Sequence, residues 1–98
     1  MATYIILGNF TEQGIRNVKD TGKRADALKG MAQKVGASVR TVYWTLGQYD
    51  IVAIIDAPDD ASVTALLLSV GALGNVRTQS LRAFTADDMT GILSRVGT

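Results

Sequence analysis

The chain contains no cysteine and no histidine. Without cysteine a disulfide framework is impossible, which fits a reducing compartment. The two absences also exclude zinc sites built on Cys or His, and they exclude Cys-His and Ser-His-Asp nucleophilic arrangements. Carboxylates, tyrosine and lysine are then the titratable side chains left for acid–base chemistry.

An excess of charge of one sign is also missing. Ten Lys and Arg stand against nine Asp and Glu, so the formal net charge is +1. A nucleic-acid-binding protein needs a basic face, and the chain has no Lys/Arg block. The nearest candidate runs from Lys19 through Lys23 and Arg24 to Lys29, but Asp20 and Asp26 interrupt it, which is typical of a solvated helix face. We expect no nucleic-acid partner.

Hydrophobic runs are short. The longest apolar-rich stretch, Ala61 to Leu73, is too short to span a bilayer and carries Ser62, Thr64 and Ser69. The first ten residues have no basic segment and only a short apolar run, unlike a signal peptide. We therefore expect a cytoplasmic protein with no membrane partner. We also expect no metal and no cofactor.

The 98 residues predict a single domain, residues 1–98. Hydrophobic residues make up 47% of the chain and charged residues 19%, which is apolar for so small a domain. Some apolar side chains must then lie at the surface, where contact with another subunit is the usual cover.

Residues that favour β-structure gather in several segments, separated by helical patterns. The predicted strands are Thr3 to Phe10, Val39 to Leu46, Tyr49 to Ala57 and Asn75 to Phe84. A helical region precedes Gly36, with a kink expected at Thr21-Gly22 and firmer periodicity after it. Pro58-Asp59-Asp60 opens a second helix that ends near Leu73. A C-terminal helix is predicted from its cap and apolar stripe: Thr85, Met89, Ile92, Leu93 and Val96.

The order β-α-β-β-α-β predicts a ferredoxin-like α+β fold with a four-stranded antiparallel sheet and an extra C-terminal helix. Right-handed crossovers place the first and third strands in the centre, giving the strand order 4-1-3-2. The sequence supports this order, because the two central strands are apolar almost throughout and the edge strands alternate. Gly47-Gln48 is predicted to make a short hairpin connection between the second and third strands.

Two helices can cover only one face of such a sheet. The other face still carries aliphatic residues of the central strands, which are too apolar to remain in water. Packing two such faces together would form a dimeric α/β barrel. The alternative is that the C-terminal helix folds over this face within one chain, but a helix of about ten residues is too small to cover four strands.

The hairpin and the segments around it resemble the GYD domain family of small prokaryotic proteins along essentially the whole chain. The resemblance lies in Gly47-Gln48-Tyr49-Asp50, Ala57-Pro58-Asp59-Asp60, Gly74-Asn75-Val76-Arg77-Thr78, Thr11-Glu12-Gln13-Gly14, Lys19-Asp20 and Arg82-Ala83-Phe84. Thr21-Gly22 departs from the Ser-Pro expected there. The resemblance implies the dimeric α/β-barrel superfamily, whose members include cofactor-free monooxygenases, isomerases, decarboxylases, haem-handling enzymes and ligand-sensing modules. The resemblance to the family therefore does not indicate a particular activity for this chain.

The predicted topology brings polar residues to one edge of the sheet, where the first strand ends beside the starts of the third and fourth. The candidate ligand-binding residues are Asn9, Tyr43, Tyr49, Asp50, Asn75 and Arg77. Arg77 could bind an anionic group, and Asp50, Tyr49 or Tyr43 could serve in acid–base catalysis. Tyr43 belongs to the half-polar strand face Val39, Thr41, Tyr43, Thr45, which could line a barrel interior or form an exposed edge.

A structural interpretation of the same residues is open. Gly47 to Asp50 can be hairpin chemistry alone, with Asp50 accepting from backbone donors or pairing with Arg77. The sequence leaves the sheet faces of these two residues undecided. Three hypotheses remain: a homo-oligomeric small-molecule-binding module, a cofactor-independent enzyme for a small organic substrate, and a purely structural homo-oligomer joined through the helix Ala61 to Leu73.

Overall fold

Four antiparallel strands form one sheet in the order β2-β3-β1-β4, which is the predicted order counted from the other edge. The structure, a computed structural model, describes residues 1–97. The strands are β1 (Ala2–Phe10), β2 (Ser38–Trp44), β3 (Ile51–Ala57) and β4 (Val76–Ala83). The helices are α1 (Glu12–Arg16), the 3₁₀ turn η1 (Val18–Asp20), α2 (Thr21–Lys34), α3 (Asp60–Ala72) and α4 (Ala86–Leu93). The ferredoxin-like α+β prediction is confirmed.

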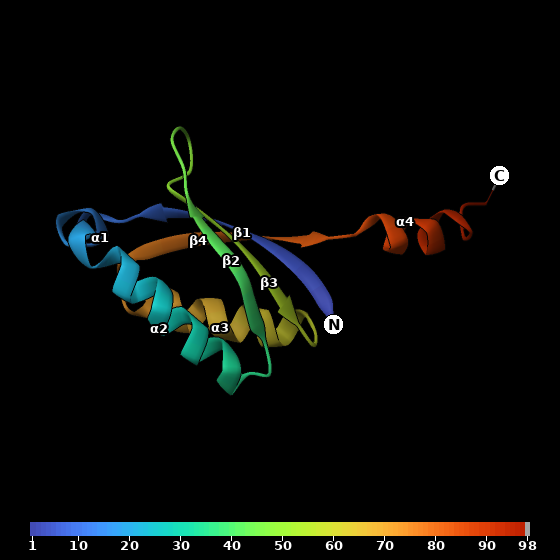
Figure 1. Cartoon of the computed structure of the whole chain (residues 1–98), viewed down its shortest axis with the longest axis horizontal. Helices are drawn as coiled ribbons and strands as arrows, with labels where there is room; N and C mark the ends of the chain where they lie inside the picture. Colours follow the sequence, from blue (N-terminus) through green and yellow to red (C-terminus); the bar gives the residue numbers. More distant parts are fainter. Residues whose placement is uncertain (98) are drawn as a thin grey trace.

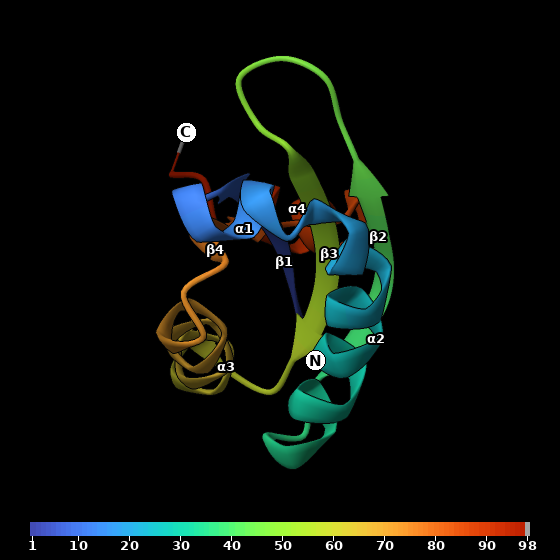
Figure 2. The same cartoon turned by 90° about the vertical axis from the view of Figure 1, so that its left-hand side faces the viewer.

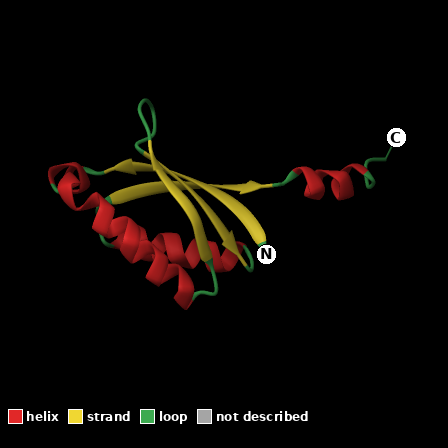
Figure 3. Cartoon of the chain, in the orientation of Figure 1, coloured by secondary structure: helices red, strands yellow, loops and turns green. Residues whose placement is uncertain are grey.

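The core lies between one face of the sheet and the helices α2 and α3, which lie on the same side of it (Figures 1 and 3). Its largest fully buried side chains are Ile55, Val63 and Leu66. Helix α3 is present where a helix was predicted, but it begins at Asp60, two residues after Pro58, because the Asp59 side chain caps it by accepting a hydrogen bond of 2.8 Å from the Ser62 backbone N–H. That cap fixes the helix start so that its apolar side meets the sheet.

The opposite side of the sheet, which we call the open sheet face, has no helix over it among residues 1–97 (Figures 1 and 3). Side chains alternate along β1: Tyr4 and Ile6 are buried against the helices, so Ile5 and Leu7 point to the other face. The strand registers place further residues beside them. Together the apolar members of the open sheet face are Ile5, Leu7, Val52, Ile54 and Leu81.

The β2–β3 hairpin is longer than predicted. Strand β2 ends at Trp44 and β3 begins at Ile51, so the expected two-residue connection at Gly47-Gln48 is wrong. Hydrogen bonds from Thr45 close a wider loop, with its N–H donating to the Asp50 carbonyl at 2.8 Å and its hydroxyl donating to the Tyr49 carbonyl at 2.6 Å. The loop projects from the sheet on the side away from the helices (Figure 2).

A β-bulge interrupts β2 between Val39 and Thr41. The extra residue shifts the alternation, so Val39 pairs with Ile55 and packs on the core while Thr41 and Tyr43 lie opposite Ile54 and Val52. The predicted strand face of Val39, Thr41, Tyr43 and Thr45 is therefore wrong, because a bulge moves its first member to the other side.

The first helical region divides into α1, η1 and α2, and α2 begins at Thr21. The break therefore comes before the predicted kink at Thr21-Gly22. Gly14 of α1 is buried, and a Cβ there would overlap the carbonyl oxygen of Asn75. Glycine at this position lets α1 approach the start of β4 closely.

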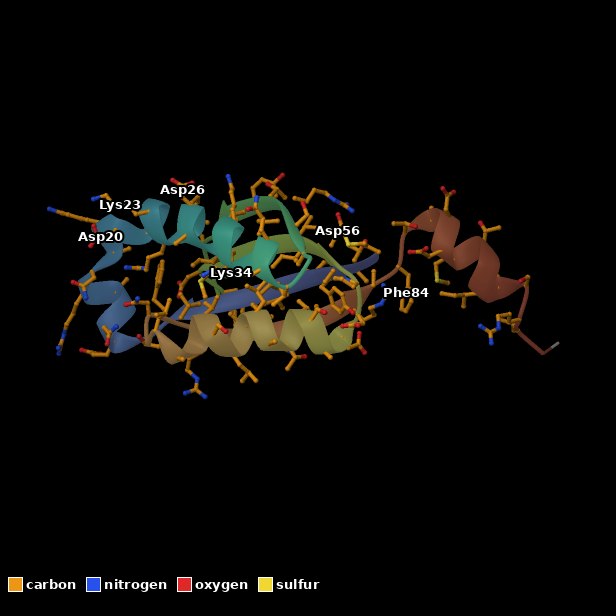
Figure 4. The ribbon with its side chains drawn as sticks, turned by 90° about the horizontal axis from the view of Figure 1, so that it is seen from below. Asp20, Lys23, Asp26, Lys34, Asp56 and Phe84 are labelled. Atoms are coloured by element: carbon orange, nitrogen blue, oxygen red, sulfur yellow. The ribbon has the colours of Figure 1, made fainter. Side chains whose placement is uncertain are left out.

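Phe84 to Val96, here called the C-terminal arm, extends away from the sheet and from the other helices (Figures 1 and 4). Its helix α4 starts with the predicted cap, since the Thr85 hydroxyl accepts from Asp88 N–H at 3.1 Å and the Asp88 carboxylate accepts from Thr85 N–H at 2.9 Å. No residue of α4 is buried. The arm does not cover the open sheet face within its own chain.

Candidate functional site

The end of β1 brings several of the predicted site residues to one edge of the sheet. Asn9 lies directly opposite Arg77 in the β1–β4 ladder, which places both on the open sheet face. Asp50 directly precedes β3, on the other side of β1. Because β1 runs between them, Asp50 and Arg77 do not pair, and within residues 1–97 neither takes part in an ion pair.

Asp50 is held by backbone groups of β1. Its N–H donates to the Gly8 carbonyl oxygen at 2.9 Å, and its carboxylate oxygen Oδ2 accepts from the Phe10 N–H at 2.9 Å. These contacts extend the β1–β3 pairing by one residue beyond Ile51. The carboxylate thus ties the hairpin to the end of β1, which is the structural role that the sequence left open for it.

The two candidate tyrosines both lie at the open sheet face. The Tyr49 hydroxyl donates to the side-chain oxygen of Gln79 at 3.3 Å, so this ring reaches from the hairpin to β4 across β1. Tyr43 lies on the edge strand β2 opposite Val52, and 57% of it is exposed. A polar rim of phenols around an apolar sheet can orient a ligand or a protein partner.

Asn75 joins α1 to the start of β4. Its carbonyl oxygen accepts from the Thr11 N–H at 3.1 Å, and its side-chain oxygen accepts from Gln13 at 2.9 Å. The Thr11 hydroxyl also donates to the carbonyl of Gly74, whose φ of +87° suits glycine. Residues 1–97 hold no group of three Asp or Glu placed as metal ligands.

A second site, which the sequence did not predict, lies on the helix side of the sheet. An apolar cleft of about 240 Å³ opens between α2 and α3, with the sheet as its floor. The floor and the two walls come from Ile6, Gly8, Ala53, Ile55, Ala25, Leu28, Met31, Leu67 and Val70. Gly8 has no side chain to occupy the floor of the cleft, and a Cβ there would lie 3.1 Å from a Val76 methyl group.

Arg24 of α2 lines this cleft. Its terminal nitrogens donate to the Asn17 carbonyl oxygen at 2.9 Å and to the Gly14 carbonyl oxygen at 3.3 Å. Each terminal nitrogen carries a second N–H as well, and the Nε donor is buried and has no hydrogen-bond acceptor among residues 1–97. The sequence grouped Arg24 with a solvated basic face, but its position four residues before Leu28 places both on one side of α2.

Trp44 stands at the rim of the cleft. Its indole N–H donates to the Thr21 hydroxyl at 3.0 Å, and 48% of the residue is exposed. This bond links the end of β2 to the start of α2. Because Trp44 is the chain's one tryptophan, its indole reports on this rim alone.

The end of the sheet near the C-terminal arm carries a buried phenol and a cation. The Tyr4 hydroxyl donates to the Asp60 carboxylate, and this hydrogen bond, followed by burial, raises the pKa of Tyr4 above its ordinary value of 10.0. The guanidinium of Arg82 lies 4.5 Å from the centre of the Phe84 ring. Arg82 forms no ion pair within residues 1–97, and its charge faces an aromatic ring instead of a carboxylate.

The sequence matches the GYD domain family over residues 4–93. This chain belongs to the GYD domain family. The GYD domain is 30% identical over 90 residues to a Thermus thermophilus protein described as a glutamine synthetase and cystathionine beta-lyase binding protein. The match covers 91% of this chain and 95% of that relative.

Solved structures with the same fold include TTHA0845 from Thermus thermophilus. It is 27% identical, with a TM-score of 0.56 over 88% of this GYD domain and 96% of that chain. FFRP-DM1 has a TM-score of 0.60 over 86% of this chain and 100% of its own, at 16% identity, which shows the shared fold alone. Within residues 1–97, no helix is both long enough and apolar enough to cross a membrane.

Proposed function

We propose that this GYD domain is a homo-oligomeric binding module whose chains join through their open sheet faces. The observation that carries the proposal is an apolar sheet surface that no helix among residues 1–97 covers (Figure 1). Ile5, Leu7 and Ile54 lie on the two central strands, and Leu81 extends the patch onto β4. Burying such a surface against a second copy removes apolar area from water, which drives association.

The Arg40–Asp56 ion pair lies at a corner of the open sheet face, and Arg77 lies opposite Asn9 where β1 ends, so both are away from the apolar centre of the face. Arg40 on the edge strand β2 donates to both carboxylate oxygens of Asp56, with a shortest distance of 2.7 Å. Asp56 accepts a further bond of 3.0 Å from the Thr3 hydroxyl. The ion pair is therefore satisfied at the corner of the sheet and leaves its centre apolar.

The C-terminal arm is a second unpartnered surface in the same chain. Its exposed apolar side chains are Met89, Ile92, Leu93 and Val96, and no residue of α4 is buried. In a face-to-face pair, an arm that extends beyond its own sheet lies beside the other copy. Each chain thus offers both an apolar arm and an apolar face, and a second copy satisfies both.

The polar rim of the open sheet face is the proposed ligand-binding region of such a pair. Asn9, Arg77, Tyr43 and Tyr49 would border the space between two sheets and can recognise a small polar molecule. Asp50 and Asn75 support this rim by holding the hairpin and α1 in place. The enzyme alternative is less well supported, because the Asp50 carboxylate is already bonded to a backbone donor.

A second candidate function is the binding of metabolic enzymes. The Thermus thermophilus relative, described as binding glutamine synthetase and cystathionine beta-lyase, aligns with nearly the whole chain. Calorimetric titration of this GYD domain with each of those enzymes from its own organism tests the idea. Saturable heat with either enzyme supports it, and no heat with both at micromolar concentrations contradicts it.

A pair of leucine variants tests the oligomer proposal. Leu81 is 40% exposed on the open sheet face, whereas Leu68 is 70% exposed on the outer side of α3. Light scattering after size exclusion should show that Leu81→Lys lowers the particle mass of the wild type and that Leu68→Lys leaves it unchanged. The reverse result would favour assembly through α3, and a monomeric wild type would remove the proposal.

A further inference from the structure

We propose that the cleft between α2 and α3 binds a small carboxylic acid with an apolar body, and that Arg24 recognises its carboxylate. The inference deepens the small-molecule part of the proposed function but does not depend on oligomerisation, because one chain supplies the whole cleft. The cleft lies across the sheet from Asn9, Arg77, Tyr43 and Tyr49, and Asn75 is the one predicted site residue that lines it.

The size of the cleft sets the size of the ligand. A dry apolar cavity of about 150 Å³ accommodates benzene, so the 240 Å³ here suit a ring or short chain with a few further atoms. The lining is almost wholly aliphatic: Leu28 and Met31 on α2 face Leu67 and Val70 on α3, above Ala53 of the floor. Such walls favour a hydrocarbon body and disfavour a sugar or a nucleotide.

Arg24 supplies the polar specificity. Its two terminal nitrogens are anchored on the carbonyls of Gly14 and Asn17, which fixes the plane of the guanidinium. The Nε donor is buried without an acceptor, and residues 1–97 place no carboxylate in an ion pair with this cation. A buried donor without an acceptor is unfavourable, and a charged guanidinium makes its strongest bonds to carboxylates.

Ligand binding in the cleft can be measured at its rim, through the indole N–H of Trp44. The Trp44 indole N–H is bonded to the hydroxyl of Thr21, three residues before Arg24 on the same helix. Because Thr21, Arg24 and Trp44 all line the cleft, a ligand bound beside Arg24 should change the surroundings of the Trp44 indole N–H. The single indole resonance of the chain is thus a local reporter that the open sheet face does not affect directly.

The test is an NMR titration of the ¹⁵N-labelled full chain with 3-phenylpropanoate and with its neutral counterpart 3-phenylpropanamide. We expect saturable shifts of the Trp44 indole signal, with the carboxylate bound about tenfold more tightly than the amide. Arg24→Gln should abolish this preference. Lys23→Gln should retain it, because Lys23 lies on the side of α2 away from α3 (Figure 4).

A further variant protects the test against loss of the fold. Ala25→Leu leaves Arg24 in place and fills part of the cleft, so it should weaken both probes equally while the dispersion of the amide spectrum stays native. Three results would overturn the proposal. They are equal affinity for acid and amide in the wild type, an unchanged preference in Arg24→Gln, and isotope-filtered contacts showing that side chains of a second copy fill the cleft. If the wild-type chain is monomeric and still shows the shifts of the Trp44 indole signal, only the homo-oligomer proposal is rejected.

Discussion

The carboxylate of Asp50 and the backbone N–H of Phe10 are joined by a hydrogen bond of 2.9 Å. Together with the bond from Asp50 N–H to the Gly8 carbonyl oxygen, it fastens the β2–β3 hairpin to the end of β1. The hairpin motif Gly47-Gln48-Tyr49-Asp50, which resembles the family, therefore has a structural role. It sets the position of Tyr49, whose hydroxyl reaches Gln79 on the far side of β1.

Asp50→Ala should lower the free energy of unfolding by about 1–3 kcal/mol, because the Phe10 N–H loses its acceptor. Asp50→Asn retains an acceptor oxygen and should cost clearly less. Urea denaturation of both variants measures the difference. Equal losses would show that the charge of Asp50, rather than the hydrogen bond to Phe10, stabilises the hairpin.

Gly14→Ala should destabilise the chain by more than about 2 kcal/mol, because the new methyl group would overlap the Asn75 carbonyl oxygen and force α1 away from β4. Gly30→Ala is the matched control. Gly30 lies in α2 with open space around it, so alanine there should stabilise the chain by about 0.5–1 kcal/mol. Thermal unfolding of the two variants should give shifts of opposite sign.

Tyr4 makes stability sensitive to alkaline pH. Because its hydrogen bond to Asp60 and then its burial raise its pKa in the folded chain, the folded state holds the phenol proton more tightly than the unfolded state, whose pKa is near 10.0. This contribution is complete below pH 10 and is lost as the pH rises through the raised pKa. Tyr4→Phe should lower stability at neutral pH by about 1 kcal/mol and reduce the alkaline loss.

Urea midpoints at neutral pH and above pH 10 measure the effect of Tyr4. Tyr43→Phe serves as the control, since Tyr43 is largely exposed on the edge strand β2. A parallel decline of the wild type and Tyr4→Phe above pH 10 would contradict the role given to the buried phenol.

Ile92→Ser in the C-terminal arm should weaken association without unfolding the chain. The side chain belongs to the exposed stripe of α4, and no residue of α4 is buried in its own chain. Dilution of the variant should therefore release monomers at concentrations where the wild type stays assembled, with an unchanged far-ultraviolet spectrum. Unaltered association would show that the arm lies outside the interface.

The sequence sufficed for the fold because topology depends on patterns that extend over whole strands. Apolar runs at Tyr4 to Leu7 and Ile51 to Ile55 identified the central strands, and handedness then fixed the order of the sheet. The edge-strand faces were less predictable. A single extra residue between Val39 and Thr41 reverses which side chains face the core, and no composition signal marks it.

The candidate site was predictable only in part for a related reason. The meeting of Asn9 with Arg77 follows from strand directions, and it was expected. The two hydrogen bonds from Arg24 to backbone carbonyl oxygens depend on how η1 turns between α1 and α2. Local periodicity in the sequence does not determine that turn. The cleft depends in addition on the spacing of α2 and α3, a tertiary property.

The most direct test of the central claim is native mass spectrometry of the freshly purified full chain over a range of concentrations, compared with its denatured mass. We expect a particle of twice the chain mass, or a higher even multiple, that persists on dilution to the micromolar range. A monomer at every concentration would contradict it, because the open sheet face and the C-terminal arm would then both remain exposed to water.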